Sequence, residues 1–541
     1  MSKVAHYLQE HLVGEVMTST DARLYFANDN SILQLAPALI AYPKSENDVR
    51  KAARFSWQLA ERGRVIPITA RGSGTSSTGA ALGSGIMLVF PAHMNRIIEL
   101  DTKSNTVIVE PGINYGKLQQ TLHTHGRFLP PYPASLEYST VGGAIADNVI
   151  GEKSIKYGDT RAYVKSLRIV LANGEVIETR RLGKRELSKK LGLATFEGEI
   201  YRSLDTLLEE YHDNLQQLER NVTINNAGYY LPEIKRRDGS FDLTPLFVGS
   251  QGTLGIITEA VLNTEPHNPQ TTLILAKFDS LEQLQNSLLD FRDLKELPSA
   301  LEMIDGNVLQ QVSALNPNQL KDIIEPPFPA VTLLIELDDR KTKKTIKRIE
   351  KILKLYANDY QIASDPEQLQ LFYKVREANS YLLGHNSGLL HAVPLFDASV
   401  PPDRLREFLE GIYRIMQTNN LKPAIWGHAG DANLQMQPML NLGQIGDRQK
   451  AFRLLDEYHK LVISLGGSIS AGGGDGRLRT PYLEYMYGVE LYALLQKVKQ
   501  IFDPYGTLNP GVKFGSSLDD IKAMVRNDYS VDHIYDHLPR S

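Results

Sequence analysis

The sequence of 541 residues contains no cysteine. This absence excludes disulfide bonds, thiolate nucleophiles, zinc sites built from cysteine, and iron–sulfur clusters. If the protein performs redox chemistry, that chemistry must belong to an organic cofactor or to a metal held by other ligands.

Strong net charge and long apolar runs are missing as well. The formal net charge is −4 and the isoelectric point is about 6.4, so we expect no nucleic-acid partner. No apolar run reaches the roughly 20 residues that span a membrane, and the first residues lack the regions of a secretory signal. We therefore expect a cytoplasmic protein of two or three domains. Peripheral attachment to a membrane and oligomer formation stay open.

The most informative stretch is a glycine loop at residues 67–79, which reads Pro-Ile-Thr-Ala-Arg-Gly-Ser-Gly-Thr-Ser-Ser-Thr-Gly. A β-branched run leads into Gly72, Gly74 and Gly79, with hydroxyl side chains between them. Glycine lets the backbone approach a ligand closely, and successive amides with hydroxyls suit a phosphate or pyrophosphate. The alternative is a mobile surface turn.

Two well-known phosphate loops do not match this stretch. It lacks the Gly-Lys-Ser/Thr ending of a P-loop. A dinucleotide fingerprint would continue into a helix, whereas residues 86–90 predict another strand. We therefore expect this loop to bind through amides and hydroxyls without a helix dipole.

The pattern changes near residue 267. Before it, residues 1–40 predict short helical turns, and Ser45 begins a predicted helix at 46–62. Residues 97–110 and 164–179 each predict a hairpin. Strands alternate there with glycine-rich loops, and residues 180–220 form a charged helical insertion. After it, predicted strands at 272–278, 300–304 and 331–337 alternate with helical stretches at 281–294 and 341–356. This second pattern favours an α+β layer, an antiparallel sheet covered by helices.

Eight stretches, in this order, resemble the flavin-dependent oxidases and dehydrogenases of the vanillyl-alcohol oxidase type. The branch they resemble holds D-lactate dehydrogenases, the glycolate oxidase catalytic subunit and D-2-hydroxyglutarate dehydrogenases. Together they extend over most of the chain, at residues 67–79, 110–112, 139–148, 156–158, 247–258, 427–433, 474–477 and 502–511.

The resemblance implies an α+β fold with a two-part FAD-binding domain and a ferredoxin-like cap. The expected boundaries are a lead-in at 1–35, the FAD-binding domain at 36–265, the cap or substrate domain at 266–490, a closing segment that returns to the flavin at 491–515, and a C-terminal tail at 516–541.

The resemblance also implies which residues hold FAD. Some relatives attach flavin through a histidine where this chain has Thr75, so non-covalent FAD is expected. The implied cofactor-binding residues are Pro67, Arg71, Gly72, Ser73, Gly74, Thr75, Ser76, Gly79, Pro133, Ser139, Thr140, Gly142, Gly143, Asn148, Tyr157, Gly252, Gly255, Ile256, Ile257 and Asn509.

The metal motif of the branch is broken in this chain. Metal-using relatives read Gly-His-x-Gly-Asp-Gly-Asn-Leu-His and later Glu-His-Gly, in which two histidines and the glutamate bind a divalent metal and the last histidine is the base. Here His428 is kept, but Gln435, Gly472 and Gly473 stand at the other positions. A catalytic metal normally takes at least three protein ligands, so we expect no metal.

The expected catalytic residues are Arg376, His428 and Asn433. Arg376 matches the arginine that clamps a substrate carboxylate, for which a guanidinium fork is suited; the alternative is a salt bridge to Glu377 or Asp397. His428 would hydrogen-bond substrate or flavin, or would be a satisfied core histidine. Candidate replacement bases are His391 and the tyrosines between residues 373 and 381.

The resemblance implies an FAD-dependent oxidoreductase that transfers hydride to flavin from a hydroxyl-bearing carbon. The expected substrate is a small, carboxylate-bearing molecule of the 2-hydroxy acid type. The alternatives are a metal-independent sugar or alcohol oxidase, and a degenerate flavin-binding interaction protein. The electron acceptor, whether oxygen, a quinone or a carrier protein, stays open.

Overall fold

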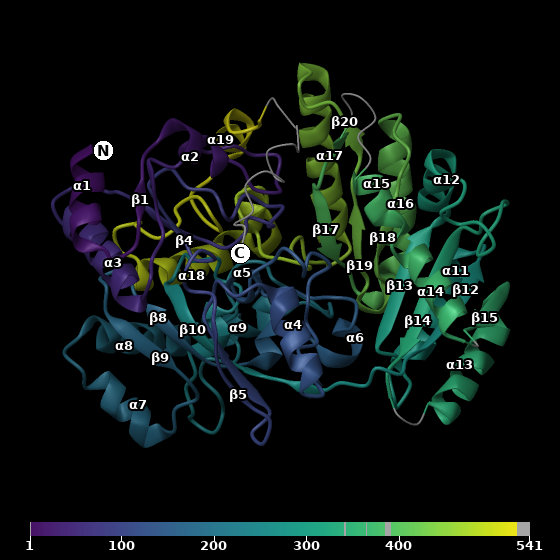
Figure 1. Ribbon diagram of the computed structural model, residues 1–541, viewed down its shortest axis with the longest axis horizontal. Helices are drawn as coiled ribbons and strands as arrows, with labels where there is room; N and C mark the ends of the chain where they lie inside the picture. Colours follow the sequence, from purple (N-terminus) through teal and green to yellow (C-terminus); the bar gives the residue numbers. More distant parts are fainter. Residues whose placement is uncertain (1, 340–341, 364, 385–390, 527–541) are drawn as a thin grey trace.

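The structure, a computed structural model, describes residues 2–339, 342–363, 365–384 and 391–526. Most elements of the first half of the chain lie on the left of Figure 1, and the strands and helices that follow residue 271 lie mainly on the right. The last helices return to the left half. Of the helices in the described ranges, none is both long and apolar enough to cross a lipid bilayer.

A four-stranded sheet carries the glycine loop. Its strands run in the order β1-β2-β4-β3, with the last three parallel. Helix α3 packs against it through buried alanines and valine, and the chain turns away from that helix at Gly63 with a φ of 79°. The bounds are α1 (Ser2–His11), β1 (Val16–Met17), α2 (Thr20–Tyr25), β2 (Leu39–Ala41), α3 (Glu46–Ala60), β3 (Ile68–Arg71) and β4 (Ile86–Val89).

The N-terminal residues do more than lead into the fold. We expected short helical turns there, and α1 and α2 form, but β1 and β2 also join the sheet. Strand β1 has only two residues, both paired to β2, and neither is buried. Two residues are too few to show an alternation of apolar and polar side chains. Propensity alone is a weak signal for such a short edge strand.

The second sheet is antiparallel, in the order β5-β6-β10-β8-β9. The predicted hairpins at 97–110 and 164–179 both form, and Asn105 and Gly174 take positive φ at their turns. The charged insertion is helical as expected. The bounds are β5 (Ile97–Asp101), β6 (Thr106–Val109), α4 (Tyr115–Thr124), β7 (Arg127–Phe128), α5 (Val141–Asp147), α6 (Ser154–Tyr157), η1 (Thr160–Tyr163), β8 (Val164–Val170), β9 (Val176–Thr179), α7 (Lys184–Leu191), α8 (Phe196–Glu210), α9 (His212–Leu218), α10 (Thr244–Phe247), β10 (Ile256–Asn263) and β11 (Glu265–Pro266).

The third sheet has seven antiparallel strands in the order β15-β12-β14-β13-β18-β19-β17. Residues of α11, α13, α16 and α17 share one apolar cluster with it, and residues of α12, α14 and α15 share another. This confirms the predicted helix-covered antiparallel sheet. The bounds are β12 (Thr272–Phe278), α11 (Leu281–Arg292), β13 (Ala300–Asp305), α12 (Gly306–Leu315), β14 (Val331–Leu337), α13 (Lys343–Tyr356), β15 (Asp359–Ile362), α14 (Pro366–Arg376), α15 (Ala378–Gly384), β16 (His391–Ala392), β17 (Phe396–Ser399), η2 (Pro402–Arg404), α16 (Leu405–Thr418), β18 (Ile425–His428), η3 (Ala429–Asp431), β19 (Asn433–Met436), β20 (Met439–Leu440) and α17 (Ile445–Ser464).

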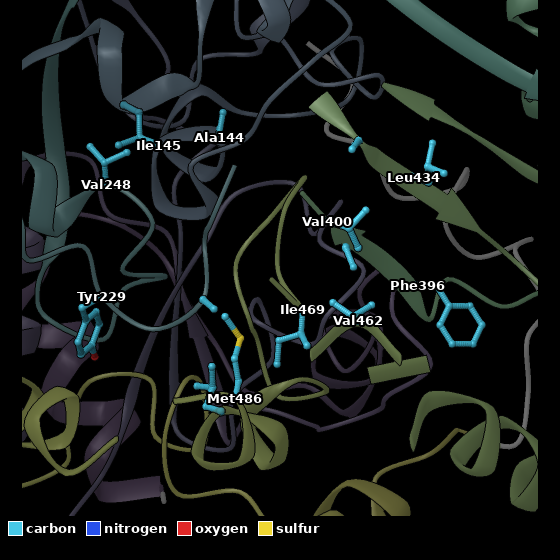
Figure 2. Packing of buried hydrophobic residues seen from close by; sticks show 14 of the residues in the cluster. Ala144, Ile145, Tyr229, Val248, Phe396, Val400, Leu434, Val462, Ile469 and Met486 are labelled. Atoms are coloured by element: carbon cyan, nitrogen blue, oxygen red, sulfur yellow. The ribbon is translucent and has the colours of Figure 1, made fainter. Parts of the chain in front are cut away.

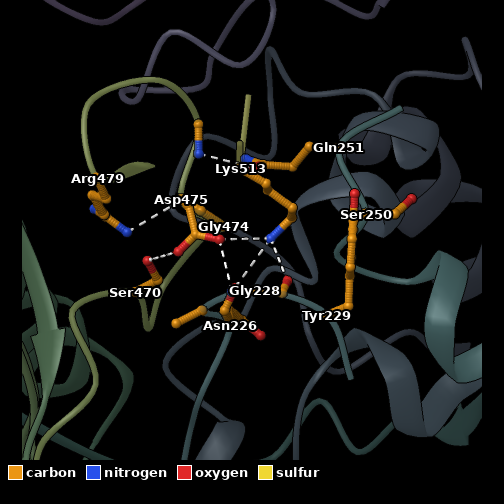
Figure 3. A network of polar contacts seen from close by, with 12 residues as sticks. Asn226, Gly228, Tyr229, Ser250, Gln251, Ser470, Gly474, Asp475, Arg479 and Lys513 are labelled. Atoms are coloured by element: carbon orange, nitrogen blue, oxygen red, sulfur yellow. Dashed lines mark hydrogen bonds and ion pairs between the residues drawn. The ribbon is translucent and has the colours of Figure 1, made fainter. Parts of the chain in front are cut away.

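The end of the chain returns to the first sheet. After η4 (Thr480–Tyr482) and α18 (Leu483–Phe502), the backbone of residues 507–509 bonds to Ile68 of β3. The fully buried Lys513 then donates to Asp475 at 2.8 Å and to the carbonyl of Gly228 at 2.7 Å (Figure 3). A last helix, α19 (Leu518–Ala523), precedes the end of the described residues, so most of the expected tail lies outside them.

The two halves share a continuous interface. One apolar cluster contains Ala144, Ile145 and Val248 from the first half together with Phe396 and Leu434 from the third sheet (Figure 2). Ion pairs cross the same boundary, since the buried Lys153 and the half-buried Lys156 of the α6 segment bond to acidic residues of β14 and the residues after it. The two halves therefore bury both apolar and charged groups against each other.

Candidate active site

A cavity of about 560 Å³ lies between the glycine loop and the third sheet. This volume is in the range of small-molecule sites, roughly 300–1,000 Å³. Its wall comes from residues 25–30, the loop at 70–81, residues 133–150 around α5, residues 250–257, and the cap residues 394–397, 428, 435, 437, 472, 473 and 479.

The glycine loop is supported by a buried arginine. Arg71 ends β3, and its guanidinium donates to the carbonyls of Phe26 at 3.2 Å and Asn28 at 2.7 Å. Gly74 has a φ of 75°, and a Cβ there would lie 2.3 Å from Nη2 of Arg71. The loop backbone thus lies directly on the arginine, a path that an L-residue side chain would obstruct.

The opposite wall is the loop that enters α5. Thr140 caps this helix by accepting from the amide of Gly143 at 3.2 Å. A Cβ on Gly72 would lie 2.2 Å from Oγ1 of Thr140, and a Cβ on Gly142 would lie 2.5 Å from Cβ of Pro111. The two glycine loops can approach this closely only because these positions carry no side chain.

Two carboxyl groups, the buried Asp29 and the half-buried Asp147, also face this end of the cavity. Burial raises the pKa of both Asp29 and Asp147, although Asp147 accepts from Nε2 of Gln251 at 2.6 Å. Oδ1 of Asn28 and Oδ2 of Asp29 are buried and have no hydrogen-bond partner among the described residues. Buried acceptors of this kind normally have partners, so they offer sites for donors of a bound molecule.

The cap end of the cavity holds a histidine–carboxylate pair. His428 on β18 lies opposite Glu302 on β13 in the strand register, and its Nδ1 is 2.6 Å from Oε1 of Glu302. Burial lowers the pKa of His428, but the carboxylate of Glu302 outweighs it, and the net pKa is raised above the usual value. His428 is therefore a polarised imidazole on the cavity wall.

A second carboxylate lines the same cavity. Asp397 on β17 accepts from Nδ2 of Asn433 at 2.8 Å and from the amide of Gly472 at 3.0 Å. Arg479 approaches the other carboxylate oxygen at 3.3 Å and also lines the cavity. Asn433 is fully buried behind this wall, so it orients Asp397 and does not itself face the cavity.

Arg376 ends α14 and forms an ion pair with Glu152 from the first half of the chain, with Glu302 4.0 Å away. The sequence offered Glu377 or Asp397 as the salt-bridge partner, so the observed partner is a different one. Arg376 is not among the described residues that line the cavity.

The structure brings most of the predicted site residues to the lining of one cavity. The lining residues among them are Arg71, Gly72, Ser73, Gly74, Thr75, Ser76, Pro133, Ser139, Thr140, Gly142, Gly143, Gly252, Gly255, Ile256, Ile257 and His428.

The remaining predicted residues lie behind the wall. Asn509 donates to the carbonyls of Ala80 and Gln251, and Asn148 bonds to Asp159 and Asn226. Tyr157 donates to Asp338 at 3.0 Å across the interface. Pro67 and Gly79 lie at the two ends of the glycine loop and do not line the cavity. Arg376 and Asn433, at the cap end, do not line it either.

Several lining residues carried no recognisable sequence signal. Asn28, Asp29 and Asn30 come from the segment treated as a lead-in, and the amide of Asn30 donates to the carbonyl of Gly74 at 3.0 Å. Asp147 and Gln251 lay inside or beside quoted motifs without being singled out. Of the candidate bases, Tyr373 donates to Glu336 and does not line the cavity, whereas the side chains of Tyr381 and His391 lie outside what the structure describes.

No group of three or more histidine, aspartate or glutamate side chains suited to a metal ion occurs in the part of the chain that the structure describes. Position 435, which also lines the cavity, offers the amide of Gln435, and positions 472 and 473 offer only backbone.

Comparison with known proteins identifies the class. The family termed FAD binding domain matches residues 37–180, and the family termed FAD linked oxidases, C-terminal domain matches residues 267–512. Glycolate oxidase subunit GlcD of Bacillus subtilis is 30% identical over 502 residues, which cover 92% of this chain and 93% of that protein. The chain therefore belongs to the family of FAD-linked oxidases.

Other relatives extend this picture. D-2-hydroxyglutarate dehydrogenase of Escherichia coli is 29% identical over 528 residues, covering 93% of this chain and 50% of that protein. The chain thus spans about half the length of the curated D-2-hydroxyglutarate dehydrogenases it matches. Among solved structures, p-cresol methylhydroxylase with substrate bound shares the fold with a TM-score of 0.69 at 15% identity, over 96% of this chain and 97% of the other.

The residues of the cavity fit FAD. The glycine loops allow close approach of backbone amides, which a dinucleotide pyrophosphate requires. The unpartnered acceptors of Asn28 and Asp29 suit hydroxyl or amino donors of a nucleotide.

Proposed function

We propose that this enzyme oxidises the hydroxyl-bearing carbon of a small, carboxylate-bearing substrate of the 2-hydroxy acid type, without a divalent metal. The observation that carries the proposal is His428 on the cavity wall opposite the glycine loop, with its Nδ1 2.6 Å from Oε1 of Glu302. The names of the relatives, D-2-hydroxyglutarate dehydrogenase and glycolate oxidase subunit, support the substrate class.

The glycine-rich end would hold the cofactor non-covalently. Residues 71–76, Ser139, Thr140 and the Gly142-Gly143 pair supply amides and hydroxyls, and Ile256 and Ile257 supply apolar surface. Thr75, whose hydroxyl lies 3.1 Å from that of Ser139, cannot form the histidyl link of covalent relatives. Acid precipitation should release all flavin to the supernatant, and yellow colour that stays in the pellet would contradict this.

The cap end would do the proton chemistry. FAD, when bound, supplies the acceptor for the hydride that leaves the carbinol carbon. The substrate also loses its hydroxyl proton, so the carbon–oxygen bond becomes a carbonyl. His428 would accept that proton at Nε2, because Nδ1 faces Glu302. Asp397, held by Asn433 and Gly472, would fix the position of the substrate at the same wall.

Activation by a metal is not required in this scheme. In the metal-using relatives the ion would lower the pKa of the substrate hydroxyl. Here Gln435 offers a neutral amide and Gly472 and Gly473 offer no side-chain ligand. A histidine polarised by a carboxylate would instead activate the substrate hydroxyl by accepting its proton.

The substrate carboxylate needs a cation near His428. Arg479 is the arginine that lines the cavity at this end, 3.3 Å from Asp397. Arg376 would have to leave Glu152 to reach the substrate, so we assign the anchoring role to Arg479 first. A neutral polyol is the second candidate, favoured by the amides of Gln435 and Gln437 on the same wall.

The test is anaerobic titration of the purified yellow holoenzyme with both enantiomers of lactate, 2-hydroxyglutarate and glycerate, and with glycolate. Bleaching of the flavin band by at least one acid is expected. His428→Gln should keep the flavin and slow the bleaching about 10²–10⁴-fold, the usual share of a general base. Bleaching only by neutral sugars or alcohols would favour the second candidate, and no bleaching by any of them would contradict both.

A further inference from the structure

The contact between Glu302 and His428 is set by strand register. The two residues are directly opposite each other on β13 and β18. Opposite positions in an antiparallel pair carry their side chains on the same face, about 5 Å apart at Cβ. The carboxylate of Glu302 therefore lies 2.6 Å from Nδ1 of His428, and the pairing of the two strands sets this contact.

Glu302 also has a charged neighbour on its other side. Nε of Arg376 lies 4.0 Å from Oε2 of Glu302. The guanidinium of Arg376 is ion-paired to Glu152, whose other oxygen accepts from the hydroxyl of Tyr132. Glu152 and Tyr132 belong to the first half of the chain, so a line of polar groups runs from that half through Arg376 to the pair in the third sheet.

We propose that Glu302 is a positioning residue that holds the Nδ1–H tautomer of His428, so that Nε2 faces the cavity with its lone pair. Arg376 and Glu152 hold the carboxylate in this arrangement across the domain boundary. The inference rests on the proposed role of His428 as the proton acceptor, and it assigns functions to Glu302 and Arg376 that do not involve substrate contact.

The physical reason is the single proton of a neutral imidazole. Whichever ring nitrogen donates its N–H, the other is the acceptor. A carboxylate accepts only, so it selects Nδ1–H. Nε2 of His428 has no hydrogen-bond partner among the described residues, and His428 lines the cavity. The charged groups that face His428 are Glu302, Asp431 and Arg376, and of these only Glu302 contacts the ring nitrogen.

The chain offers a matched control on the next strand. Glu336 of β14 is as buried as Glu302, and it is paired across the same domain boundary with Lys153 at 2.5 Å. It also accepts from the hydroxyls of Ser299 and Tyr373. Glu336→Gln therefore removes a buried interdomain charge of the same kind without touching His428.

The first measurement needs no substrate. In holoenzyme labelled with 15N-histidine, the resonances of His428 are assigned by their loss in His428→Gln. The wild type should show the Nδ1–H form whenever the ring is neutral. Glu302→Gln, whose amide can donate to Nδ1, and Glu302→Ala, which removes the acceptor, should both populate the Nε2–H form. Glu336→Gln should leave the spectrum of His428 unchanged. An unchanged tautomer in both Glu302 variants would overturn the inference.

The second measurement uses the acid found to bleach the flavin. Glu302→Gln should slow flavin reduction about 10²–10⁴-fold, the cost of a wrong tautomer in comparable dyads, with KM changed less than about threefold. Glu302→Asp should recover part of that loss. Equal rates for Glu302→Gln and the wild type would reject the positioning role while the proposed oxidation stands. If no substrate bleaches the flavin, the proposed function fails and the tautomer measurement still decides this inference.

Discussion

The two ends of the cavity are built in different ways. At the glycine-rich end, contiguous backbone from residues 71–78 and 139–147 makes the wall, and glycines permit the close approach. At the cap end, side chains from β13, β17 and β18 meet only because the strands pair in one register. One end therefore depends on local backbone conformation, and the other on charge pairs between residues that are far apart in the sequence.

The largest expected effect is at the glycine-rich end. Gly74→Val should abolish FAD binding, because a β-branched residue resists a φ of 75° and its Cβ would lie 2.3 Å from Arg71. The measurement is the ratio of flavin to protein absorbance after purification. Gly63→Val is the matched control, since Gly63 has a φ of 79° but no neighbour within 4 Å. Stoichiometric flavin in Gly74→Val would refute the cradle.

Removing the interdomain arginine tests whether the cap end depends on paired charges. Arg376→Ala leaves Glu152 buried without its partner, and we expect it to cost about 3–5 kcal/mol of the free energy of unfolding. Arg404→Ala, which breaks an exposed pair with Glu407, should cost less than about 1 kcal/mol. Chemical denaturation of the holoenzymes measures both.

The same Arg376 variant distinguishes two roles for this residue. If Arg376 clamps a substrate carboxylate instead, stability should stay near the wild-type value while substrate binding weakens by about 2–5 kcal/mol. That combination would contradict the positioning role and restore the function expected from the sequence.

Two cap histidines, the half-buried His428 and the buried His459, sharpen the comparison further. His428 has a carboxylate partner and a raised pKa, whereas burial lowers the pKa of His459 to about 3, with Arg479 nearby. In the unfolded chain, His459 takes up a proton near pH 6.5, whereas in the folded protein it stays neutral. The free energy of unfolding therefore falls as the pH drops below 6.5. Between pH 6.5 and 5 this amounts to about 2 kcal/mol.

His459→Leu should therefore lose less stability than the wild type on acidification over this interval. Melting temperatures of the two proteins at pH 7.5 and pH 5 provide the comparison. Parallel losses in both proteins would show that His459 does not resist protonation in the fold.

The smallest expected effect is that of metal removal, which should change nothing. Dialysis against a strong chelator should leave flavin reduction by the substrate intact, because His428 stands without the second histidine and the glutamate of metal-using relatives. Elemental analysis accompanies the assay. Near-stoichiometric zinc, manganese or iron, with activity lost on chelation and restored by the ion, would overturn the metal-free scheme.

Local patterns predicted much of this structure. The helix after Ser45, both hairpins and the antiparallel cap sheet follow from apolar periodicity and turn residues, which act over a few neighbours. The first glycine loop was predicted from its glycines and hydroxyls, whereas the wall residues at 133–143 and 252–257 were implied by the family resemblance. Edge strand β1 could not be predicted, because its two residues leave no periodic signal in the sequence.

The sequence by itself excluded thiolates from any redox chemistry and predicted a phosphate cradle of backbone amides and hydroxyls at residues 67–79. It also showed that a single histidine of the metal motif remains. Only the tertiary structure decided what that histidine touches. Glu302 lies 126 residues away along the chain, and Glu152 reaches Arg376 from the other half. Charge pairs of this kind depend on strand register and domain docking, which no local pattern encodes.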